Sequence, residues 1–322
     1  MQVSPSGQTP MVEVKDLRKE FGPKVAVDGI SFSVAKGEVL GFLGPNGAGK
    51  STTMRMITGF IPPSDGRVTV GGFDMAEQPV DAKRLIGYLP ENAPAYTDMT
   101  VHGFLTFAAE LRGLSGDAKR KAVDRVVEMC FLEAVLHQSV ETLSKGYRHR
   151  TCFAQSILHD PPVLILDEPT DGLDPNQKHE VRTLIRRMGE SKAIIFSTHI
   201  LEEVEAVCSR AIVIDRGRIV ANGTPAELKR RSPRAGVVIV RFAAPTDAAA
   251  KLRTISGVES VDPLDGEPAF TVKGRNGDLG TAIYDLAVSE RWKIADLHAE
   301  EGRLDDVFRS ITQPDTKEVT AR

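Results

Sequence analysis

Two stretches of this sequence together carry the chemistry of nucleoside triphosphate hydrolysis. The first, GPNGAGKST at residues 44–52, fills all four fixed positions of the phosphate-binding pattern G-x-x-x-x-G-K-[ST]. The second, VLILDEPT at residues 163–170, is an apolar run that ends abruptly in Asp167 and Glu168. A phosphate cradle and a pair of carboxylates at the end of a buried strand are the equipment of an NTP hydrolase.

Each residue type in the 44–52 loop has a chemical reason. Its glycines let backbone N–H groups curl around phosphate oxygens without Cβ clashes, and the helix expected from Ser51 directs its positive end at them. Lys50 is placed to reach the β- and γ-phosphates, and the Ser51 hydroxyl to bind Mg²⁺. A plain glycine-rich turn does not account for all four filled positions. The residues expected to bind nucleotide here are Gly44, Pro45, Asn46, Gly47, Ala48, Gly49, Lys50, Ser51 and Thr52.

The two carboxylates and a histidine have complementary expected roles. Asp167 would hold Mg²⁺, directly or through water, which leaves Glu168 to orient and polarise the attacking water as general base. His199 ends the apolar run AIIFST and can connect a γ-phosphate to Glu168. Taken alone, Asp167 and Glu168 could be a helix cap after a strand, and His199 a packing residue; the nearby phosphate loop favours the catalytic interpretation.

A second anion-binding position is expected in LSKGY, at residues 143–147. Ser144 and Gly146 open the helix RHRTCFAQSIL, so their donors form another helix N-terminus able to bind an anion. Because the chain already has a complete phosphate loop, this terminus needs a different explanation. The simpler alternative is that Ser144 is only a helix cap.

Strands and helices that alternate along the chain must position these groups. Continuous apolar runs predict a parallel sheet buried on both faces, and its carboxyl ends are where such sheets place ligands. Residues from about 100 to 158 are predicted to be mostly helical because apolar residues recur at three- and four-residue spacing, including 101–114 and 118–136. The other predicted elements are strands at 39–43, 68–70, 86–89, 163–166 and 193–196, helices at 51–60, 178–188 and 201–210, and a hairpin that turns at Arg216–Gly217.

A second domain follows the basic segment KRRSPRAG at residues 229–236, which we predict to be a linker. The order strand, helix, strand, strand, helix, strand, helix is that of a split βαβ, ferredoxin-like unit. It has no glycine loop and no cluster of carboxylates or histidines, so a structural or docking role is expected. The strands are predicted at 237–242, 258–261, 270–273 and 292–298, and the helices at 247–255, 278–291 and 304–311.

Composition narrows the class of protein. The 322 residues suffice for about two domains of roughly 150 residues each. Hydrophobic residues at 41% and charged residues at 26% are ordinary for a soluble globular protein, and a net charge of −3 implies no bulk attraction to nucleic acid. The three scattered cysteines are expected to be reduced, buried thiols. No apolar stretch reaches the ~20 residues that span a bilayer and no signal peptide is apparent, so any membrane role would use a partner chain.

The ordered set of motifs resembles an ATP-binding cassette (ABC) ATPase over roughly residues 12–230. The order is phosphate loop, glutamine-type loop, LS-x-G, DEPT, GLD at residues 172–174, and then His199. The resemblance implies a P-loop NTPase, α/β in class, with a RecA-like core sheet and a helical subdomain at about 90–160. It is followed by the small α+β ferredoxin-like domain at 236–312, with disordered tails at 1–11 and 313–322.

The resemblance also implies roles for further residues. Phe21 lies where an aromatic ring stacks on adenine. Ser144 and Gly146 would contact the γ-phosphate of nucleotide held by a second copy, and Asp174 would cross that dimer interface. Glu91, in IGYLPEN, stands where the family usually has Gln; a carboxylate can ligate Mg²⁺ or water but cannot donate a hydrogen bond.

Two other departures concern side chains near the nucleotide. Lys145 and Tyr147 replace the Gly and Gln of the common LSGGQ, while the Ser hydroxyl and the second Gly remain. Lys145 either adds a cation near the γ-phosphate or is merely solvated, and the sequence leaves both open. Phe21 replaces the more usual Tyr and keeps its stacking face.

The segments LSKGYRHR, YLPEN, LDPNQ, STHILEEVE and RLDDVF resemble the branch of ABC-2-type exporter ATPases that includes gliding-motility and copper-processing types. This predicts a subunit that binds ATP and Mg²⁺, hydrolyses ATP, pairs with a second copy and energises a separate permease from the cytoplasmic side of the membrane. A non-transport ABC ATPase acting on ribosomes or DNA is the alternative; such relatives usually carry two cassettes or long coiled-coil insertions. A nucleotide sensor without turnover would not need Glu168 and His199.

Overall fold

The computed structural model describes residues 9–312 except 93, 233 and 275–278. The chain divides into two compact units, Met1–Pro225 and Ala226–Arg322. The division falls before the basic segment 229–236, which therefore belongs to the second unit. Most of the predicted tail at 1–11, all of the tail at 313–322 and the predicted helix start at Asp278 lie outside the described residues.

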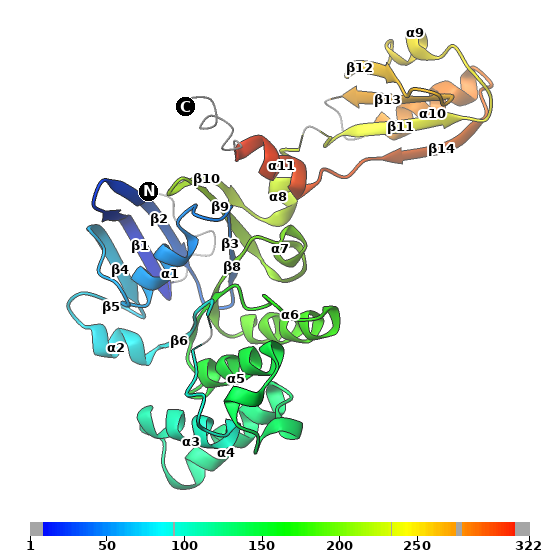
Figure 1. Cartoon of the computed structure of the whole chain (residues 1–322). Helices are drawn as coiled ribbons and strands as arrows, with labels where there is room; N and C mark the ends of the chain where they lie inside the picture. The colour runs from blue at the N-terminus through cyan, green and yellow to red at the C-terminus, as the bar shows by residue number, and fades with distance from the viewer. Residues whose placement is uncertain (1–8, 93, 233, 275–278, 313–322) are drawn as a thin grey trace, which may run out of the picture. The chain divides into compact units, whose positions relative to one another are not determined.

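The centre of the first unit is a six-stranded sheet with the strand order β10-β9-β3-β8-β7-β6 (Figure 1). Every neighbouring pair is parallel except β9 with β10, the predicted hairpin. All residues of β3, β7 and β8 are buried, as expected for a parallel sheet covered on both faces. The strands are β3 (Val39–Leu43), β6 (Ile86–Leu89), β7 (Val163–Asp167), β8 (Ala193–Thr198), β9 (Arg210–Asp215) and β10 (Arg218–Gly223).

A second sheet, antiparallel and four-stranded, has the order β2-β1-β4-β5. Its strands are β1 (Val12–Phe21), β2 (Lys24–Val34), β4 (Asp65–Val70) and β5 (Phe73–Asp74). Strands β1, β2 and β5 were not predicted, so the prediction that strands and helices alternate was wrong for this region. A register shift after Val14, near Asp16 at φ 46°, interrupts the apolar alternation of β1.

Three helices flank the central sheet. Helix α1 (Lys50–Ile57) buries Met54, Met56 and Ile57 in the same hydrophobic core as residues of both sheets. Helices α6 (Pro175–Gly189) and α7 (Leu201–Val207) contact β8. All three were predicted, although α1 and α7 end three residues before their predicted ends and α6 begins earlier, where the Asp174 capping box starts it.

The mostly helical segment is confirmed. Helices α3 (Val101–Leu111), α4 (Gly116–Met129) and α5 (Lys145–Ile157) lie together, and a short helix α2 (Pro79–Arg84) precedes them (Figure 1). The predicted helix at 118–136 was wrong beyond Met129, because Phe131 takes a left-handed φ of 54° that ends α4. None of the helices in the described ranges combines the length and the apolar character needed to cross a membrane.

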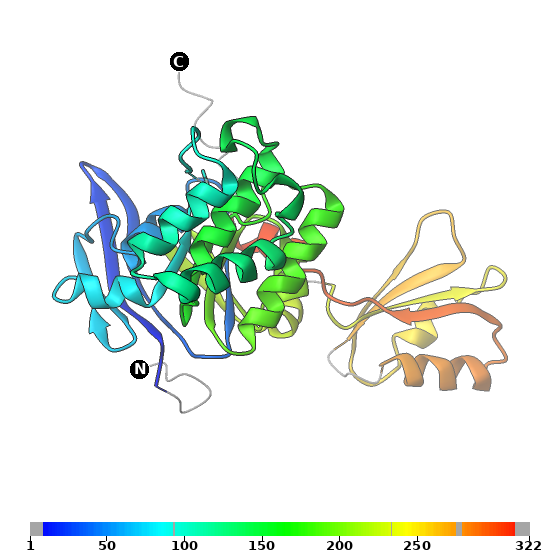
Figure 2. The ribbon, with the colours of Figure 1, turned by 90° about the horizontal axis from the view of Figure 1, so that it is seen from below.

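The second unit contains β11 (Val237–Phe242), α9 (Ala249–Leu252), β12 (Val258–Pro263), β13 (Ala269–Gly274), α10 (Leu279–Ser289), β14 (Ile294–Ala299) and α11 (Leu304–Ile311). A short helix α8 (Pro225–Lys229) runs into it. The antiparallel sheet order β12-β13-β11-β14 puts the first and third strands in the centre, as in ferredoxin-like units. Figure 2 shows α9 and α10 on one side of this sheet. The predicted order is confirmed, with α9 shorter than expected.

Candidate functional site: a nucleotide pocket

The phosphate loop joins the end of β3 to the start of α1. Gly47 and Gly49 take left-handed φ values of 80° and 109°. A Cβ on Gly49 would lie 2.5 Å from the carbonyl oxygen of Ala26, so only glycine fits there. Lys50 is buried, and its Nζ donates to the carbonyl oxygens of Gly44 at 2.7 Å and Pro45 at 3.3 Å. These contacts hold the ammonium across the mouth of the loop, where a phosphate would sit.

The two carboxylates lie at the end of β7 and are held by β8. Asp167 is buried, and the Ser197 hydroxyl donates to its Oδ1 at 2.5 Å. The backbone N–H of Glu168 donates to Ser197 Oγ at 3.0 Å and to its carbonyl oxygen. Glu168 has a φ of 52°, an uncommon value that directs its side chain away from the path of the strand. Ser197 was not among the predicted site residues; its position directly after the predicted strand 193–196 and two residues before His199 was the available signal.

Glu168 is placed between two nitrogen groups. Its Oε2 lies 2.9 Å from Nδ1 of His199, and its Oε1 lies 3.8 Å from Nζ of Lys50. Burial raises the pKa of Glu168, and the charges of His199 and Lys50 oppose that rise. Burial also lowers the pKa of Lys50, against the attraction of Glu168, Asp167 and Glu91. A partly buried carboxylate of raised pKa beside a phosphate loop is chemically suited to take a proton from water.

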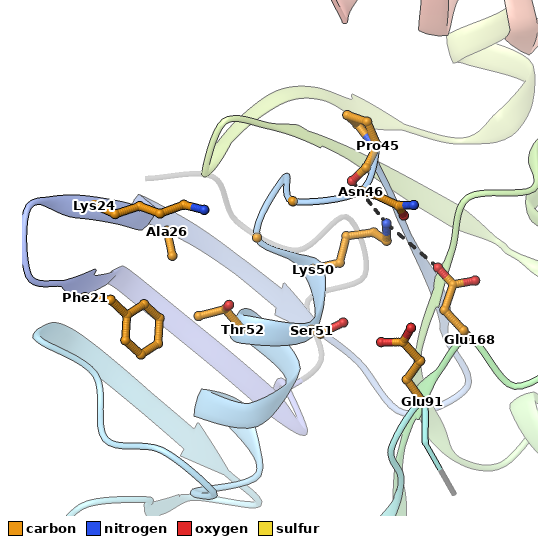
Figure 3. A pocket seen from close by; sticks show the side chains of 12 residues that line it. Phe21, Lys24, Ala26, Pro45, Asn46, Lys50, Ser51, Thr52, Glu91 and Glu168 are labelled. Carbon is orange, nitrogen blue, oxygen red and sulfur yellow. Dashed lines mark hydrogen bonds and ion pairs between the residues drawn. The ribbon is translucent and has the colours of Figure 1, made fainter. Parts of the chain in front are cut away.

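A pocket of about 350 Å³ runs along this arrangement (Figure 3). Phe21, at the end of β1, forms one wall with its ring half exposed, and Nζ of Lys19 lies 5.3 Å from the ring centroid. Lys24 and Ala26 of β2 also line the pocket, which the sequence did not predict. Of the predicted nucleotide-binding residues, the pocket is lined by Phe21, Pro45, Asn46, Gly47, Gly49, Lys50, Ser51 and Thr52, together with Glu91 and Glu168.

Hydroxyl and carboxylate oxygens at one end of the pocket could ligate a magnesium ion together with phosphate oxygens of the nucleotide. The side chains of Ser51, Glu91 and Glu168 face the same space in Figure 3. Asp167 lies beside Glu168 at the strand end. No group of three or more His, Cys, Asp or Glu side chains able to hold a metal occurs among the described residues. Mg²⁺ commonly uses one or two carboxylates plus substrate phosphates, so this sparse oxygen set matches it.

Ser144, Gly146 and Asp174 do not line the pocket of their own chain. Ser144 caps α5, and its hydroxyl accepts from the backbone N–H of Tyr147 at 3.3 Å. Asp174 caps α6 in a reciprocal capping box with Gln177. A Cβ on Gly146 would lie 2.7 Å from Gln177 Oε1, so the two helix starts are packed against each other. The structure thus brings these three residues near one another but not to the phosphate loop.

Lys145 is partnered within its own chain. Its Nζ lies 2.8 Å from Oδ2 of Asp171, and the hydrogen bond from Lys145 lowers the pKa of Asp171. Both side chains are exposed, so the pair contributes only about 0–1 kcal/mol and another anion could displace Asp171. The two alternatives predicted for Lys145, a γ-phosphate contact and a solvated side chain, did not include this pairing.

Comparisons with known proteins identify the family of this chain. The family model for "ABC transporter" matches residues 27–171. The linearmycin resistance ATP-binding protein LnrL of Bacillus subtilis is 32% identical over 306 residues, which are 94% of this chain and 98% of that protein. The Nod factor export ATP-binding protein I of Paraburkholderia xenovorans is 35% identical over 302 residues, 94% of this chain and 96% of that protein.

Solved structures lead to the same family. An ATP-binding subunit of an ABC transporter has a TM-score of 0.64 and 31% identity, and the match covers 69% of this chain and 92% of that one. A dimeric bacterial ABC transporter cassette, at 21% identity and a TM-score of 0.63 over 67% of this chain and 99% of that one, shows the shared fold. Such subunits pair with a second nucleotide-binding domain and a membrane permease. The chain therefore belongs to the ABC transporter family, as one of its ATP-binding subunits and an ATPase.

Proposed function

We propose that this chain hydrolyses ATP as the nucleotide-binding subunit of an ABC-2-type exporter, with Glu168 as the general base. The observation that carries the proposal is the position of Glu168 between Lys50 and His199 beside the phosphate loop. ATP would lie in the pocket with its adenine on Phe21 and its phosphates along the backbone of Gly44–Thr52. Ala48 is buried and its backbone N–H donates to the carbonyl oxygen of Pro45 at 3.2 Å, so its part is to shape the loop.

In this mechanism a water molecule attacks the γ-phosphorus and gives a proton to a Glu168 carboxylate oxygen, while the bond to the β-phosphate oxygen breaks. Lys50 neutralises charge that develops on the phosphates. His199 faces Glu168 through Nδ1, which leaves Nε2 for the γ-phosphate. The ionised carboxylate of Glu168 accepts a hydrogen bond from the Nδ1–H group of His199. Nε2 can then donate to the γ-phosphate only when the imidazole is protonated on both nitrogens.

Mg²⁺ would supply charge neutralisation on the transferred phosphate. Ser51 and Asp167 would hold it, with Glu91 as a further ligand or a ligand to its water. Because Glu91 lines the pocket and carries only acceptors, it acts here through metal or water rather than as a hydrogen-bond donor.

A second copy of the chain would complete each site. Ser144 and Gly146 lie at the N-terminus of α5 and outside the pocket of their own chain, which supports a role toward the nucleotide of another copy. Asp174, packed against the same helix start through Gln177, would lie at the interface between the copies. The homodimer would close on ATP and loosen after the γ-phosphate leaves.

The partner in the membrane would be a separate ABC-2-type permease, which the helical segment α3–α5 would contact from the cytoplasmic side. Export is supported by the Nod factor export ATP-binding protein I, which matches 94% of this chain. The relative of equal coverage from Bacillus subtilis is a linearmycin resistance ATP-binding protein. The second unit, with its ferredoxin-like sheet, would be an accessory domain of this subunit, and no nucleic-acid partner is expected at a net charge of −3.

The test is purification of the tagged chain from detergent-solubilised membranes of its own host, followed by ATPase assays. We expect one multispanning membrane protein to copurify, and Mg²⁺-dependent ATP hydrolysis that EDTA abolishes. Copurification with ribosomes or nucleic acid instead would contradict the transport role. Hydrolysis that is unaffected by EDTA would contradict the metal assignment.

A further inference from the structure

A buried carboxylate outside the pocket joins the two loops that carry the catalytic pair. Glu203, on α7, is fully buried. The Thr170 hydroxyl donates to its Oε1 at 2.5 Å and the Thr198 hydroxyl donates to its Oε2 at 2.7 Å. A guanidinium nitrogen of Arg182, on α6, lies 3.5 Å from Oε1. One side chain thus links the segment that follows β7 and the last residue of β8 with two helices.

The partners of Glu203 are close in sequence to the groups that act on the nucleotide. Thr170 lies two residues after Glu168, and Thr198 directly precedes His199. The Thr198 hydroxyl also accepts from the backbone N–H of Ile200 at 3.0 Å. This hydroxyl therefore fixes the backbone on both sides of His199 while it is itself fixed by Glu203.

The burial of this carboxylate makes its contacts matter. A buried charge is costly unless it is paired and hydrogen-bonded, and here two hydroxyl donors and one guanidinium satisfy it. Removal of one hydroxyl leaves a buried acceptor short of a partner, so the loops are expected to rearrange. None of Glu203, Thr170, Thr198 and Arg182 lines the nucleotide pocket. A change in this cluster should therefore act on the geometry of hydrolysis and not on ATP contacts.

We propose that Glu203 is a positioning residue for hydrolysis, which keeps Glu168 and His199 in contact by tying the loop after β7 to the last residue of β8. The inference rests on the proposed roles of Glu168 and His199. In the structure those two side chains come from different strand ends and meet at 2.9 Å. Their meeting requires the two strand ends to hold a fixed spacing, and the Thr170–Glu203–Thr198 bridge spans those ends.

The test compares valine and serine at the two threonines, in the full-length chain. Thr198→Val and Thr170→Val remove a hydroxyl at nearly constant volume, whereas Thr198→Ser and Thr170→Ser keep it. For each valine variant we expect kcat to fall roughly tenfold or more, the effect of one lost hydrogen bond to a charged group. KM for ATP and ATP binding should change by less than about threefold, since the pocket is untouched. The serine variants should restore most of the turnover.

The thermal unfolding temperature of each variant is measured beside its ATPase activity. A variant that stays folded but loses kcat has lost positioning of the catalytic groups, not its fold. If Glu203→Gln proves unstable, the four threonine variants carry the test, because each changes only one methyl or hydroxyl group. A valine variant with normal kcat, a rise in KM without a fall in kcat, or a serine variant as slow as the valine variant would overturn the proposal.

A double-mutant cycle distinguishes this inference from the catalytic assignment beneath it. In a His199→Ala background, Thr198→Val should lower the residual turnover less than twofold, because the residue that it positions is absent. Independent, multiplicative losses would overturn the positioning role while leaving the role of His199 intact. If His199→Ala alone leaves turnover unchanged, the assigned role of His199 fails instead.

Discussion

Glu168→Gln separates proton transfer from binding at the site. Glutamine has nearly the same volume and can still accept from Nδ1 of His199, which lies 2.9 Å from the carboxylate. Its amide cannot take a proton from water. The general-base contribution of about 10²–10⁴-fold in rate, equivalent to about 3–5 kcal/mol, should therefore be lost.

The affinity for ATP should be kept or should rise in this variant, although the rate of hydrolysis falls. Oε1 of Glu168 lies 3.8 Å from Nζ of Lys50, and its negative charge also faces the space expected for the γ-phosphate. The neutral amide removes that repulsion, so the variant should bind ATP at least as tightly as the unchanged chain. A dimer that closes on ATP should also persist, because the γ-phosphate is not removed.

The assays are single-turnover hydrolysis and size measurement with ATP and Mg²⁺. Glu202→Gln is the matched control, since it is the same chemical change at an exposed glutamate that does not line the pocket. Hydrolysis by the Glu168→Gln variant at nearly the rate of the unchanged chain would contradict the assignment of Glu168 as general base, and Glu91 would then be the first carboxylate to test as base.

Three further outcomes are expected. Lys50→Ala should weaken ATP binding about tenfold or more in calorimetry, because it removes the buried ammonium of the phosphate loop; unchanged affinity would contradict the loop assignment. His149 is buried, neither ring nitrogen is hydrogen-bonded to any described residue, and burial lowers its pKa from 6.5 to about 4. Because His149 takes up a proton more readily in the unfolded chain, the free energy of unfolding should fall as the pH drops below 6.5. The loss from this one group should reach about 2 kcal/mol at pH 5. Urea titrations of the His149→Gln variant should lack that part of the pH dependence. Truncation after Pro225 should leave a folded unit that binds ATP, measured by circular dichroism and calorimetry, and a folded fragment without affinity would show that the second unit contributes to the site.

Local sequence patterns predicted the features that depend on neighbouring residues. The phosphate loop needs glycines at fixed spacing, and the apolar runs before Asp167 and His199 identify strands that end at one edge of a parallel sheet. The ferredoxin-like order could be predicted because each strand and helix carries its own periodicity.

Features that depend on pairing between distant segments were missed. Strand β1 is interrupted by a bulge and held by its partners, so its period is weak in the sequence. The role of Ser197 depends on the fold, which places its hydroxyl beside Asp167, 30 residues away in the sequence. The pairing of Lys145 with a residue 26 positions away likewise cannot be read from either residue alone.

In the proposed dimer a second copy completes each ATP site, and disulfide formation between two chains is the sharpest test of that arrangement. Cysteines would replace Ser144 in one tagged chain and Asn46 of the phosphate loop in another. The native Cys130, Cys152 and Cys208 are buried, and burial raises the pKa of each thiol, which keeps them unreactive. We predict an ATP-dependent disulfide between chains of different tag. Absence of that disulfide with ATP bound, or a disulfide only within a chain that carries both cysteines, would contradict the claim.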